Sequence, residues 1–482
     1  MKSALFTSYH DLKKKDNNRR IWLEGEPLLR AGFIPGDYYQ SSMDLDTLSV
    51  TLSHVPDSLE ARELHKKRQV HKISRRQMNG WVKPIIDICN AEITSLFGEA
   101  CRFRAQAFTD HIIFSIHPED AKRIKRESRL LNHINDGYIT KGDAFVGIGV
   151  STHAIHEGFK RAGLKTQQKW AVEIDARYLD VACQNNPSIF KHAHMFVSSV
   201  EEVEKDLLEP VDAFGFSMPC TNHSAQGVTK KMLKNAEEGG EVTALFGTIA
   251  MIQAVNPAIL FSENVPRAKG SVTYNILLKE LTRLGYDYEE MILDESHGGS
   301  LEKRRRYWFV AYSKGLGIDK TKLMPLTQNK VHACLGDVLE TEDEPSSWHD
   351  LTKFEVRQKK NEESNRNFKM NLVDEKSTSV STIGRLYSKH QISNPHITNN
   401  KGQYRLLSPV EHARVKRVPE SLIKHCSDTT AHEGLGQGIL YLQAVGLAQA
   451  IINALTLCHM KDKKKLSHKT IQYQAPLFAS YA

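Results

Sequence analysis

A cysteine in the sequence context of a reactive thiol lies near the middle of the chain. Pro219 and Cys220 follow the apolar run VDAFGFSM and precede a loop rich in asparagine, serine and glycine. Open α/β sheets bind ligands at the carboxyl ends of their strands, so a thiol at this point is placed for nucleophilic attack. The other six cysteines lack this context, and we interpret them as buried packing residues. Cys220 is therefore the candidate nucleophile.

A carboxyl group and a cluster of guanidinium groups are predicted at the same edge of the sheet. The apolar run PAILFSENV carries Glu263 near its end, and Arg304, Arg305 and Arg306 come directly before the run YWFVAYS. Taken singly, these residues are equally typical of an ion-pair network. Together with the thiol, in this order and at strand ends, they indicate one catalytic rim.

A glycine-rich turn and a later acidic residue are typical of nucleotide binding. The run DAFVGIGV contains Phe145, Gly147 and Gly149 and leads into the helical pattern HAIHEGFKRAG. Glycines at a strand-to-helix turn let a ligand approach the backbone closely, although a structural tight turn fits the spacing equally well. Glu173 stands at the end of the next apolar run, where a carboxylate can accept both hydroxyls of a ribose. After a G-x-G turn, this favours a cofactor role for Glu173 over an ordinary surface charge.

These residues require a sheet that brings strand ends together. Between 141 and 316, short apolar runs alternate with helical patterns, which predicts a doubly wound, Rossmann-like α/β sheet with a crossover helix after each strand. The segment 321–402 is polar and weakly periodic, and we interpret it as an insertion within one catalytic unit. The sequence shows no convincing internal repeat. The expected domains are a β-rich N-terminal domain over 1–135, a cofactor-binding catalytic domain over 136–320, the insertion over 321–402, the C-terminal part of the catalytic domain over 403–460 and a basic tail over 461–482.

Composition restricts the class of protein. The 482 residues are 40 % hydrophobic and 25 % charged, with a net charge of +8, which excludes wholesale disorder and is compatible with a polyanionic partner. No apolar run reaches the ~18 residues of a membrane span, and the N-terminus lacks the apolar segment of a signal peptide. Seven cysteines without a C-x-x-C pair indicate neither a zinc ribbon nor a disulfide framework. We expect a reduced, intracellular protein.

The ordered motifs resemble those of the cytosine-5 DNA methyltransferase family. DAFVGIGV is similar to the family pattern D-L-F-x-G-x-G-G, Pro219-Cys220 to P-C, and E-N-V is unchanged. The Q-x-R-x-R motif appears as EKRRR, R-x-L-T-P-x-E-x-A-R-L as RLLSPVEHARV, and G-N-x-V as GQGI. Five positions depart from the family pattern. Val150 stands where the family has Gly, Ser199 where it has Asp, Thr221 and Glu302 where it has Gln, and Gln437 where it has Asn.

The resemblance implies methyl transfer from S-adenosyl-L-methionine to carbon 5 of a cytosine flipped out of duplex DNA. The Cys220 thiolate would add to carbon 6 and Glu263 would protonate ring nitrogen 3. Arg306 would bind the cytosine carbonyl oxygen, and Arg304 would hold a phosphate or the nucleophile loop. No metal is implied, and the insertion 321–402 would read the target sequence in the major groove. The implied cofactor contacts are Phe145, Gly147, Gly149, Glu173, Ile174, Ser199, Pro219 and Gln437.

Residues 1–135 resemble a second, smaller family. The segments RIWLEGEPLLRAGFIPGDYY and KPIIDICN are similar to SymE-like β-barrels, relatives of AbrB-type swapped-hairpin DNA-binding domains. A family-specific β-rich extension fits equally well. The basic runs at 66–68 and 122–126 suit a phosphate backbone or a solvated face.

The expected partner is double-stranded DNA, with a cognate restriction endonuclease in the cell and no membrane. We expect a bacterial or phage-encoded enzyme acting on nucleoid DNA in the cytoplasm, monomeric or dimeric through its N-terminal domain. Two alternatives stay open, namely a tRNA cytosine-5 methyltransferase and a DNA-binding regulator in which methylation is secondary. The insertion favours DNA, and the intact P-C, E-N-V and R-x-R motifs argue against loss of the chemistry.

Overall fold

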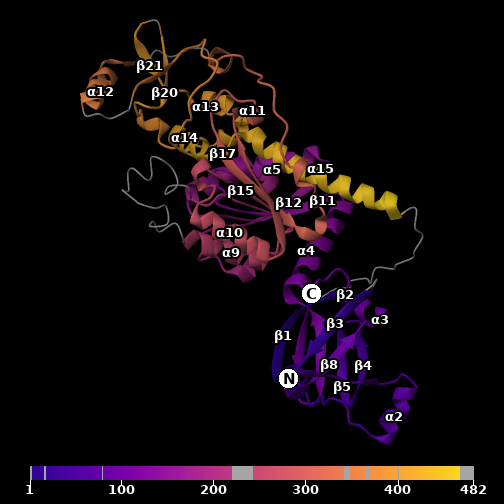
Figure 1. Ribbon diagram of the computed structural model, residues 1–482. Helices are drawn as coiled ribbons and strands as arrows, with labels where there is room; N and C mark the ends of the chain where they lie inside the picture. The colour runs from indigo at the N-terminus through magenta and orange to yellow at the C-terminus, as the bar shows by residue number, and fades with distance from the viewer. Residues whose placement is uncertain are drawn as a thin grey trace. The chain divides into compact units, whose positions relative to one another are not determined.

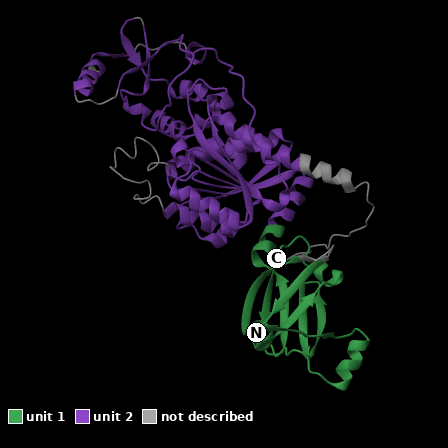
Figure 2. Cartoon of the chain, viewed as in Figure 1, with its two compact units in different colours: residues 1–125 green, residues 126–482 purple. Residues whose placement is uncertain are grey.

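The chain forms two compact units, residues 1–125 and 126–482 (Figure 2). The division falls inside helix α4 (Pro118–Asn135), earlier than the boundary at 135 expected from the sequence. The computed structural model (Figure 1) describes residues 3–15, 18–78, 80–219, 243–340, 348–363, 369–399 and 401–466.

The N-terminal unit contains two antiparallel sheets. One has the strand order β1-β9-β10-β5-β4-β6 and the other the order β2-β3-β8-β7. Buried side chains from both sheets, such as Leu23, Ile86, Phe103 and Phe114, form one apolar core. The strands are β1 (Phe6–Asp11), β2 (Lys13–Lys15), β3 (Asn18–Glu24), β4 (Tyr38–Asp44), β5 (Ser49–Val55), β6 (His71–Lys72), β7 (Ser74–Met78), β8 (Trp81–Ile88), β9 (Arg102–Ala107) and β10 (His111–Ile116). The helices are α1 (Glu26–Arg30), α2 (Leu59–Lys66) and α3 (Ala91–Ser95).

The two halves of this unit have the same topology. The series β1-β2-β3-α1-β4-β5 and β6-β7-β8-α3-β9-β10 follow the same order along the chain, and exchanging them leaves both sheet orders unchanged. Equivalent ring contacts recur at His10–Phe103 and at Tyr39–His71. This likeness is one of topology, and the sequence itself shows no convincing repeat. The halves share topology but few residues, since IWLEGEPLLR in the first corresponds to IDICNAEITS in the second.

The larger unit is organised around a seven-stranded sheet of order β13-β12-β11-β14-β15-β17-β16. The strands from β13 to β15 pair in parallel, whereas β17 is antiparallel to both of its neighbours. This confirms the Rossmann-like α/β class, with a mixed sheet in place of a purely parallel one. The strands are β11 (Tyr138–Ala144), β12 (Lys165–Glu173), β13 (His194–Val197), β14 (Ala213–Phe216), β15 (Ile259–Asn264), β16 (Tyr286–Leu293) and β17 (Arg306–Ser313).

Helices cover both faces of this sheet (Figure 1). One face packs against α5 (Val150–Arg161) and α15 (Tyr441–Leu466), and the other against α9 (Thr243–Val255) and α10 (Val272–Arg283). No single helix in the described ranges is long and apolar enough to cross a membrane. One bent pair, Asp428–Gln437 with Tyr441–Thr456, meets that test only when its two helices are taken together. The remaining α-helices of the sheet domain are α6 (Ala176–Asn185), α7 (Pro187–Phe190), α11 (Glu295–Gly298), α13 (Pro409–Val415) and α14 (Asp428–Gln437).

The insertion expected over 321–402 is a folded subdomain. Its sheet has the order β18-β21-β20-β19, and its last strand along the chain lies wholly beyond the expected end at 402, so the predicted bound is too early. Leu335, Ile383 and Tyr387 are fully buried in an apolar core there, which a solvated charged loop would lack. Its elements are β18 (His349–Asp350), α12 (Thr352–Glu363), β19 (Asn371–Val373), β20 (Pro395–Thr398) and β21 (Gln403–Arg405).

Candidate active site

The glycine-rich turn lies after β11, at the carboxyl edge of the sheet. Phe145, Gly147 and Gly149 have φ angles of 59°, 56° and 85°. A Cβ atom on Gly149 would lie 3.2 Å from the Cβ of Ala182, so this position requires glycine both for its backbone conformation and for space. A Cβ atom on Gly147 would meet no atom within 4 Å, so open space adjoins the turn. Val150, a departure from the family pattern, begins α5 as a buried residue.

Glu173 ties this turn to the end of β12. Its Oε2 accepts a hydrogen bond from the backbone N–H of Gly147 at 2.8 Å, and its Oε1 accepts one from that of Asp175 at 3.0 Å. The residue is buried. A carboxylate offers about four acceptor positions, so capacity remains for ligand hydroxyl groups. Fixed acceptors beside open space fit a cofactor that carries a ribose.

Two further predicted cofactor contacts lie near Glu173 along the sheet edge. Ile174 follows it and is 69 % exposed. Val197 of β13 pairs with Glu173, so Ser199 lies just beyond the same edge, where its Oγ accepts a hydrogen bond from the backbone N–H of Glu202 at 3.3 Å. The sequence did not predict β13, because only four residues, HMFV, form it and none of them is fully buried.

Glu263 and Arg306 form an ion pair at the ends of two antiparallel strands. Because β15 and β17 run in opposite directions, the end of the first lies beside the start of the second. The Arg306 Nε lies 2.9 Å from the Glu263 Oε1. Burial raises the pKa of Glu263 against the opposing charges of Arg306 and Arg304. A buried carboxyl group beside a guanidinium can donate to a ring nitrogen and to an adjacent carbonyl oxygen of one heterocycle.

The predicted nucleophile Cys220 lies outside the described residues. Pro219 precedes it, is half-buried and follows β14. The Asn264 Nδ2 donates a hydrogen bond to the backbone carbonyl of Met218 at 3.0 Å. The residue next to the Glu263 carboxyl thus holds the chain just before the cysteine, a role that the E-N-V motif did not reveal by itself.

Glu302, Arg304 and Lys416 form a fully buried charge cluster next to this ion pair. The Glu302 Oε2 lies 3.2 Å from the Lys416 Nζ, and its Oε1 lies 3.2 Å from the Arg304 Nη1. Burial acts to raise the pKa of Glu302, but the charges of Lys416 and Arg304 outweigh it and hold this pKa below its ordinary value. Burial, assisted by Arg304, lowers the pKa of Lys416 to about 7. Sequence reasoning missed Lys416, because its partner Glu302 is distant along the chain.

Arg304 joins three segments of the larger unit. It is 1 % exposed, and besides Glu302 it contacts the backbone carbonyls of Ile383 in the insertion and of Gly436 in α14, at 3.2 and 2.9 Å. A phosphate ligand would require an exposed guanidinium, so this burial favours a positioning role. Gln437, the next predicted contact, is exposed at the end of α14.

The described residues contain no group of three or more His, Cys, Asp or Glu side chains that could hold a metal ion. Two of the predicted groups of site residues are each assembled at the carboxyl edge of the sheet. The first is the turn with Glu173, which fits a nucleoside, and the second is the Glu263–Arg306 pair, which fits a planar base.

Residues 139–456 match the family of C-5 cytosine-specific DNA methylases. This match covers about two thirds of the chain and, apart from Tyr138 at the start of β11, the whole seven-stranded sheet, and the chain belongs to this family. Enzymes of the family use S-adenosylmethionine in general. The N-terminal unit lies outside the match, and its resemblance to a SymE-like barrel stays a prediction.

Several relatives are type II methyltransferases. M.MspI of Moraxella sp is 22 % identical over 283 residues, covering 58 % of this chain and 61 % of the relative. M.DsaV of Dactylococcopsis salina is 25 % identical over 333 residues, covering 67 % and 88 %. The mouse (Mus musculus) tRNA (cytosine(38)-C(5))-methyltransferase is 23 % identical over 171 residues, covering 35 % and 39 %. The chain spans about three fifths of M.MspI and about half of M1.BsuMI of Bacillus subtilis.

Solved structures show the same fold. The methyltransferase EhMeth of Entamoeba histolytica superposes with a TM-score of 0.52 at 14 % identity, covering 66 % of this chain and 99 % of that one. A mutant of DNMT2 from Spodoptera frugiperda gives 0.50 at 16 % identity, with coverage of 66 % and 99 %.

Proposed function

We propose that the protein is a DNA cytosine-5 methyltransferase acting on a flipped cytosine in duplex DNA. The observation that carries this proposal is the buried Glu263–Arg306 pair, 2.9 Å apart, on a strand end tied by Asn264 to the segment that leads into Cys220. A carboxyl group, a guanidinium and a thiol at one point are the groups that activation of cytosine carbon 5 requires.

The chemistry follows from the weak nucleophilicity of that carbon. The Cys220 thiolate adds to carbon 6, forming a carbon–sulfur bond, while Glu263 gives a proton to ring nitrogen 3. Burial raises the pKa of Glu263, which favours the protonated carboxyl that this step requires. Arg306 donates to the cytosine carbonyl oxygen and limits charge on the ring. Carbon 5 then takes the methyl group as the sulfonium–methyl bond of the donor breaks and leaves a neutral thioether. A base removes the carbon 5 proton, the carbon–sulfur bond to Cys220 breaks to release the thiolate, and ring nitrogen 3 returns its proton to Glu263.

The chain's own residues hold the methyl donor at the neighbouring turn. Bound S-adenosyl-L-methionine supplies an electrophilic methyl group. Glu173, held by the backbone N–H of Gly147, would accept hydrogen bonds from the ribose hydroxyls, the open space beside Gly147 would admit the ligand, and the exposed Ile174 would pack against the adenine. Phe145, Gly149, Ser199, Pro219 and Gln437 complete the proposed contacts.

Duplex DNA is the proposed substrate, and the folded insertion is the proposed reader of its sequence. Flipping a base costs a few kcal/mol, which contacts in the pocket must offset. The similarity to tRNA methyltransferases keeps structured RNA as the alternative substrate. A cytoplasmic enzyme paired with a restriction endonuclease is part of the same proposal.

Trapping with 5-fluorocytosine tests the reaction. Fluorine at carbon 5 cannot leave as a proton does, so duplex DNA carrying this base should form an adduct that resists denaturation when the cofactor is present. Cys220→Ala should form none, whereas Cys334→Ala, at a half-buried free cysteine, should react like the parent protein. An adduct in Cys220→Ala would overturn the assignment, and trapping on fluorinated tRNA but not on DNA would select the RNA alternative.

A further inference from the structure

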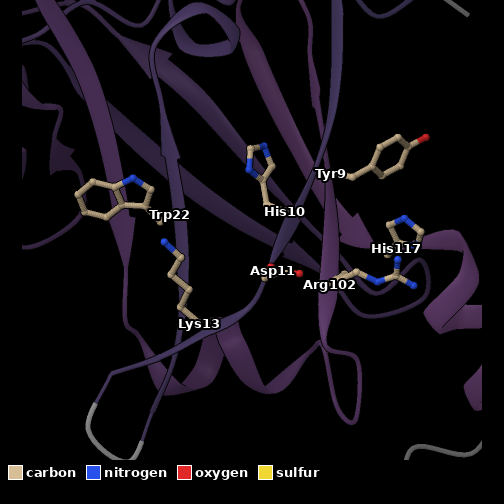
Figure 3. A pocket seen from close by; sticks show the side chains of 7 residues that line it. All are labelled: Tyr9, His10, Asp11, Lys13, Trp22, Arg102 and His117. Atoms are coloured by element: carbon tan, nitrogen blue, oxygen red, sulfur yellow. The ribbon is translucent and has the colours of Figure 1, made fainter. Parts of the chain in front are cut away.

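The N-terminal unit contains a cavity of about 450 Å³, outside the residues that match the methylase family (Figure 3). Cationic and acidic groups line it together, since Lys13 and Arg102 lie there with Asp11. Arg102 is already paired with Asp120, at 2.9 Å. The lining therefore selects no single charge class of ligand. A more specific arrangement lies in the larger unit.

Tyr274 is a buried tyrosine of α10 whose hydroxyl lies at the end of β15. Its oxygen accepts a hydrogen bond from the Asn264 Nδ2 at 2.9 Å. The same Nδ2 donates to the backbone carbonyl of Met218 at 3.0 Å, and the Asn264 Oδ1 accepts the backbone N–H of Val265 at 2.8 Å. Both hydrogens of the amide nitrogen are therefore used. The tyrosine hydroxyl thus fixes the orientation of the amide that holds Met218.

Tyr274 also contacts the strand that carries Arg306. Strand pairing opposes Asn264 to Tyr307, and the Tyr274 ring meets the Tyr307 ring edge-on with centroids 5.3 Å apart. Side chains alternate along a strand, so the neighbours of these two paired residues, Glu263 and Arg306, point to the opposite face of the sheet. The tyrosine therefore supports, from behind, the strand ends that hold the ion pair.

The hydroxyl of Tyr274 exceeds what packing requires. Its ring lies against Tyr307 and Phe309 in the apolar core on this face of the sheet. A phenylalanine ring would make the same contacts without bringing a polar atom into that core, where such an atom costs free energy unless it is hydrogen-bonded. Because the hydroxyl accepts from Asn264, its contribution acts on the residue next to Glu263.

We infer that Tyr274 is a positioning residue for methyl transfer, because its hydroxyl fixes the Asn264 amide that ties the end of β14 to the end of β15. Met218 lies just past the first of these strand ends, and Glu263 lies within the second. Tyr274 acts through Asn264 rather than on the cytosine. A displacement of about 1 Å between reacting groups can slow a reaction by about 100-fold. This role rests on the proposed function, since the step concerned is the attack on the cytosine ring.

Tyr274→Phe in the full chain tests this role, because it removes the hydroxyl and keeps the ring. Two rates are measured, namely methyl transfer to plasmid DNA prepared without the enzyme and adduct formation with an amplified duplex in which 5-fluorocytosine replaces every cytosine. Both kcat and the rate of adduct formation should fall about tenfold, the scale of one lost hydrogen bond. The KM for DNA and the Kd of S-adenosyl-L-methionine should stay within about twofold, because the hydroxyl serves the reacting geometry and not binding.

Tyr286→Phe is the matched control. Tyr286 is equally buried, and its hydroxyl donates to the backbone carbonyl of Pro257 at 2.6 Å, before the start of β15 and away from the end that carries Glu263. This variant should lose about as much stability in urea unfolding as Tyr274→Phe and keep the parent kcat. In an Asn264→Ala background, Tyr274→Phe should slow the reaction no further, because the tyrosine acts through that amide.

A kcat in Tyr274→Phe equal to that of the parent chain would overturn the positioning role. An equal fall in Tyr286→Phe, a full further loss in the Asn264→Ala background, or a raised KM for DNA at unchanged kcat would overturn it as well. Absence of both methyl transfer and adducts with the parent chain would instead overturn the proposed function, and the positioning role with it.

Discussion

Lys416→Met should destabilise the larger unit because it leaves a buried carboxylate with reduced compensation. Glu302 and Lys416 are both fully buried, and their charged atoms lie 3.2 Å apart. The Lys416 Nζ also contacts the backbone carbonyl of Gly438 at 3.2 Å. Methionine retains the length and apolar stem of lysine and removes the charge.

The magnitude follows from these distances. Two unit charges 3.2 Å apart interact by about 5 kcal/mol at an effective dielectric constant near 20. Desolvation of the ammonium offsets part of this, and removing one partner of a buried pair costs about 3–5 kcal/mol. Arg304 and the backbone N–H of Ile383 still contact Glu302, so we expect the lower end, about 3 kcal/mol.

Urea unfolding at pH 6, below the pKa of about 7 for Lys416, measures the effect. With a slope near 3 kcal/mol per molar for a unit of this size, the midpoint should fall by about 1 M. Glu302→Gln combined with Lys416→Met removes both charges and should recover most of the loss, giving a large coupling in the double-mutant cycle. A cost below about 1 kcal/mol for Lys416→Met, or a double variant no more stable than the single one, would refute this reasoning.

Two further predictions concern the acidic residues of the site. Glu173→Ala should weaken S-adenosyl-L-methionine binding, measured by calorimetry, by roughly 1.5–3 kcal/mol, which is the scale of hydrogen bonds to a charged group. An unchanged affinity would mean that Glu173 only holds the turn and does not bind the cofactor. Glu263→Gln should abolish methylation. Burial raises the pKa of Glu263 in the folded protein above its ordinary value of 4.5. Between these two pKa values the folded protein binds a proton that the unfolded chain has lost, so its free energy of unfolding falls as the pH rises. The parent should therefore lose stability relative to Glu263→Gln as the pH rises from 4.5 to 7. Urea midpoints at both pH values check the sign, and an opposite trend would contradict it.

Much of the candidate site follows from local sequence. Strand ends are marked by apolar runs that stop at polar residues, and this local pattern is sufficient to locate Glu173 and Glu263. Gly149 is marked by the strand-to-helix turn, where its left-handed backbone and its closeness to Ala182 require glycine. The role of Asn264 was hidden, because a side chain that binds the backbone of another strand leaves no periodic signal.

The sequence by itself determined the order of the motifs, the α/β class and the strand ends that carry the reactive groups, because strand alternation, turn residues and helical periodicity act over a few neighbouring residues. Only the tertiary structure decided which of these groups meet. The antiparallel direction of β17 brings Arg306 to Glu263, and the return of the chain through α13 brings Lys416 to Glu302. It likewise revealed that the two halves of the N-terminal unit agree in strand pairing although they share few residues. Pairing between distant segments depends on shape and charge complementarity over the whole chain, and no local pattern encodes it.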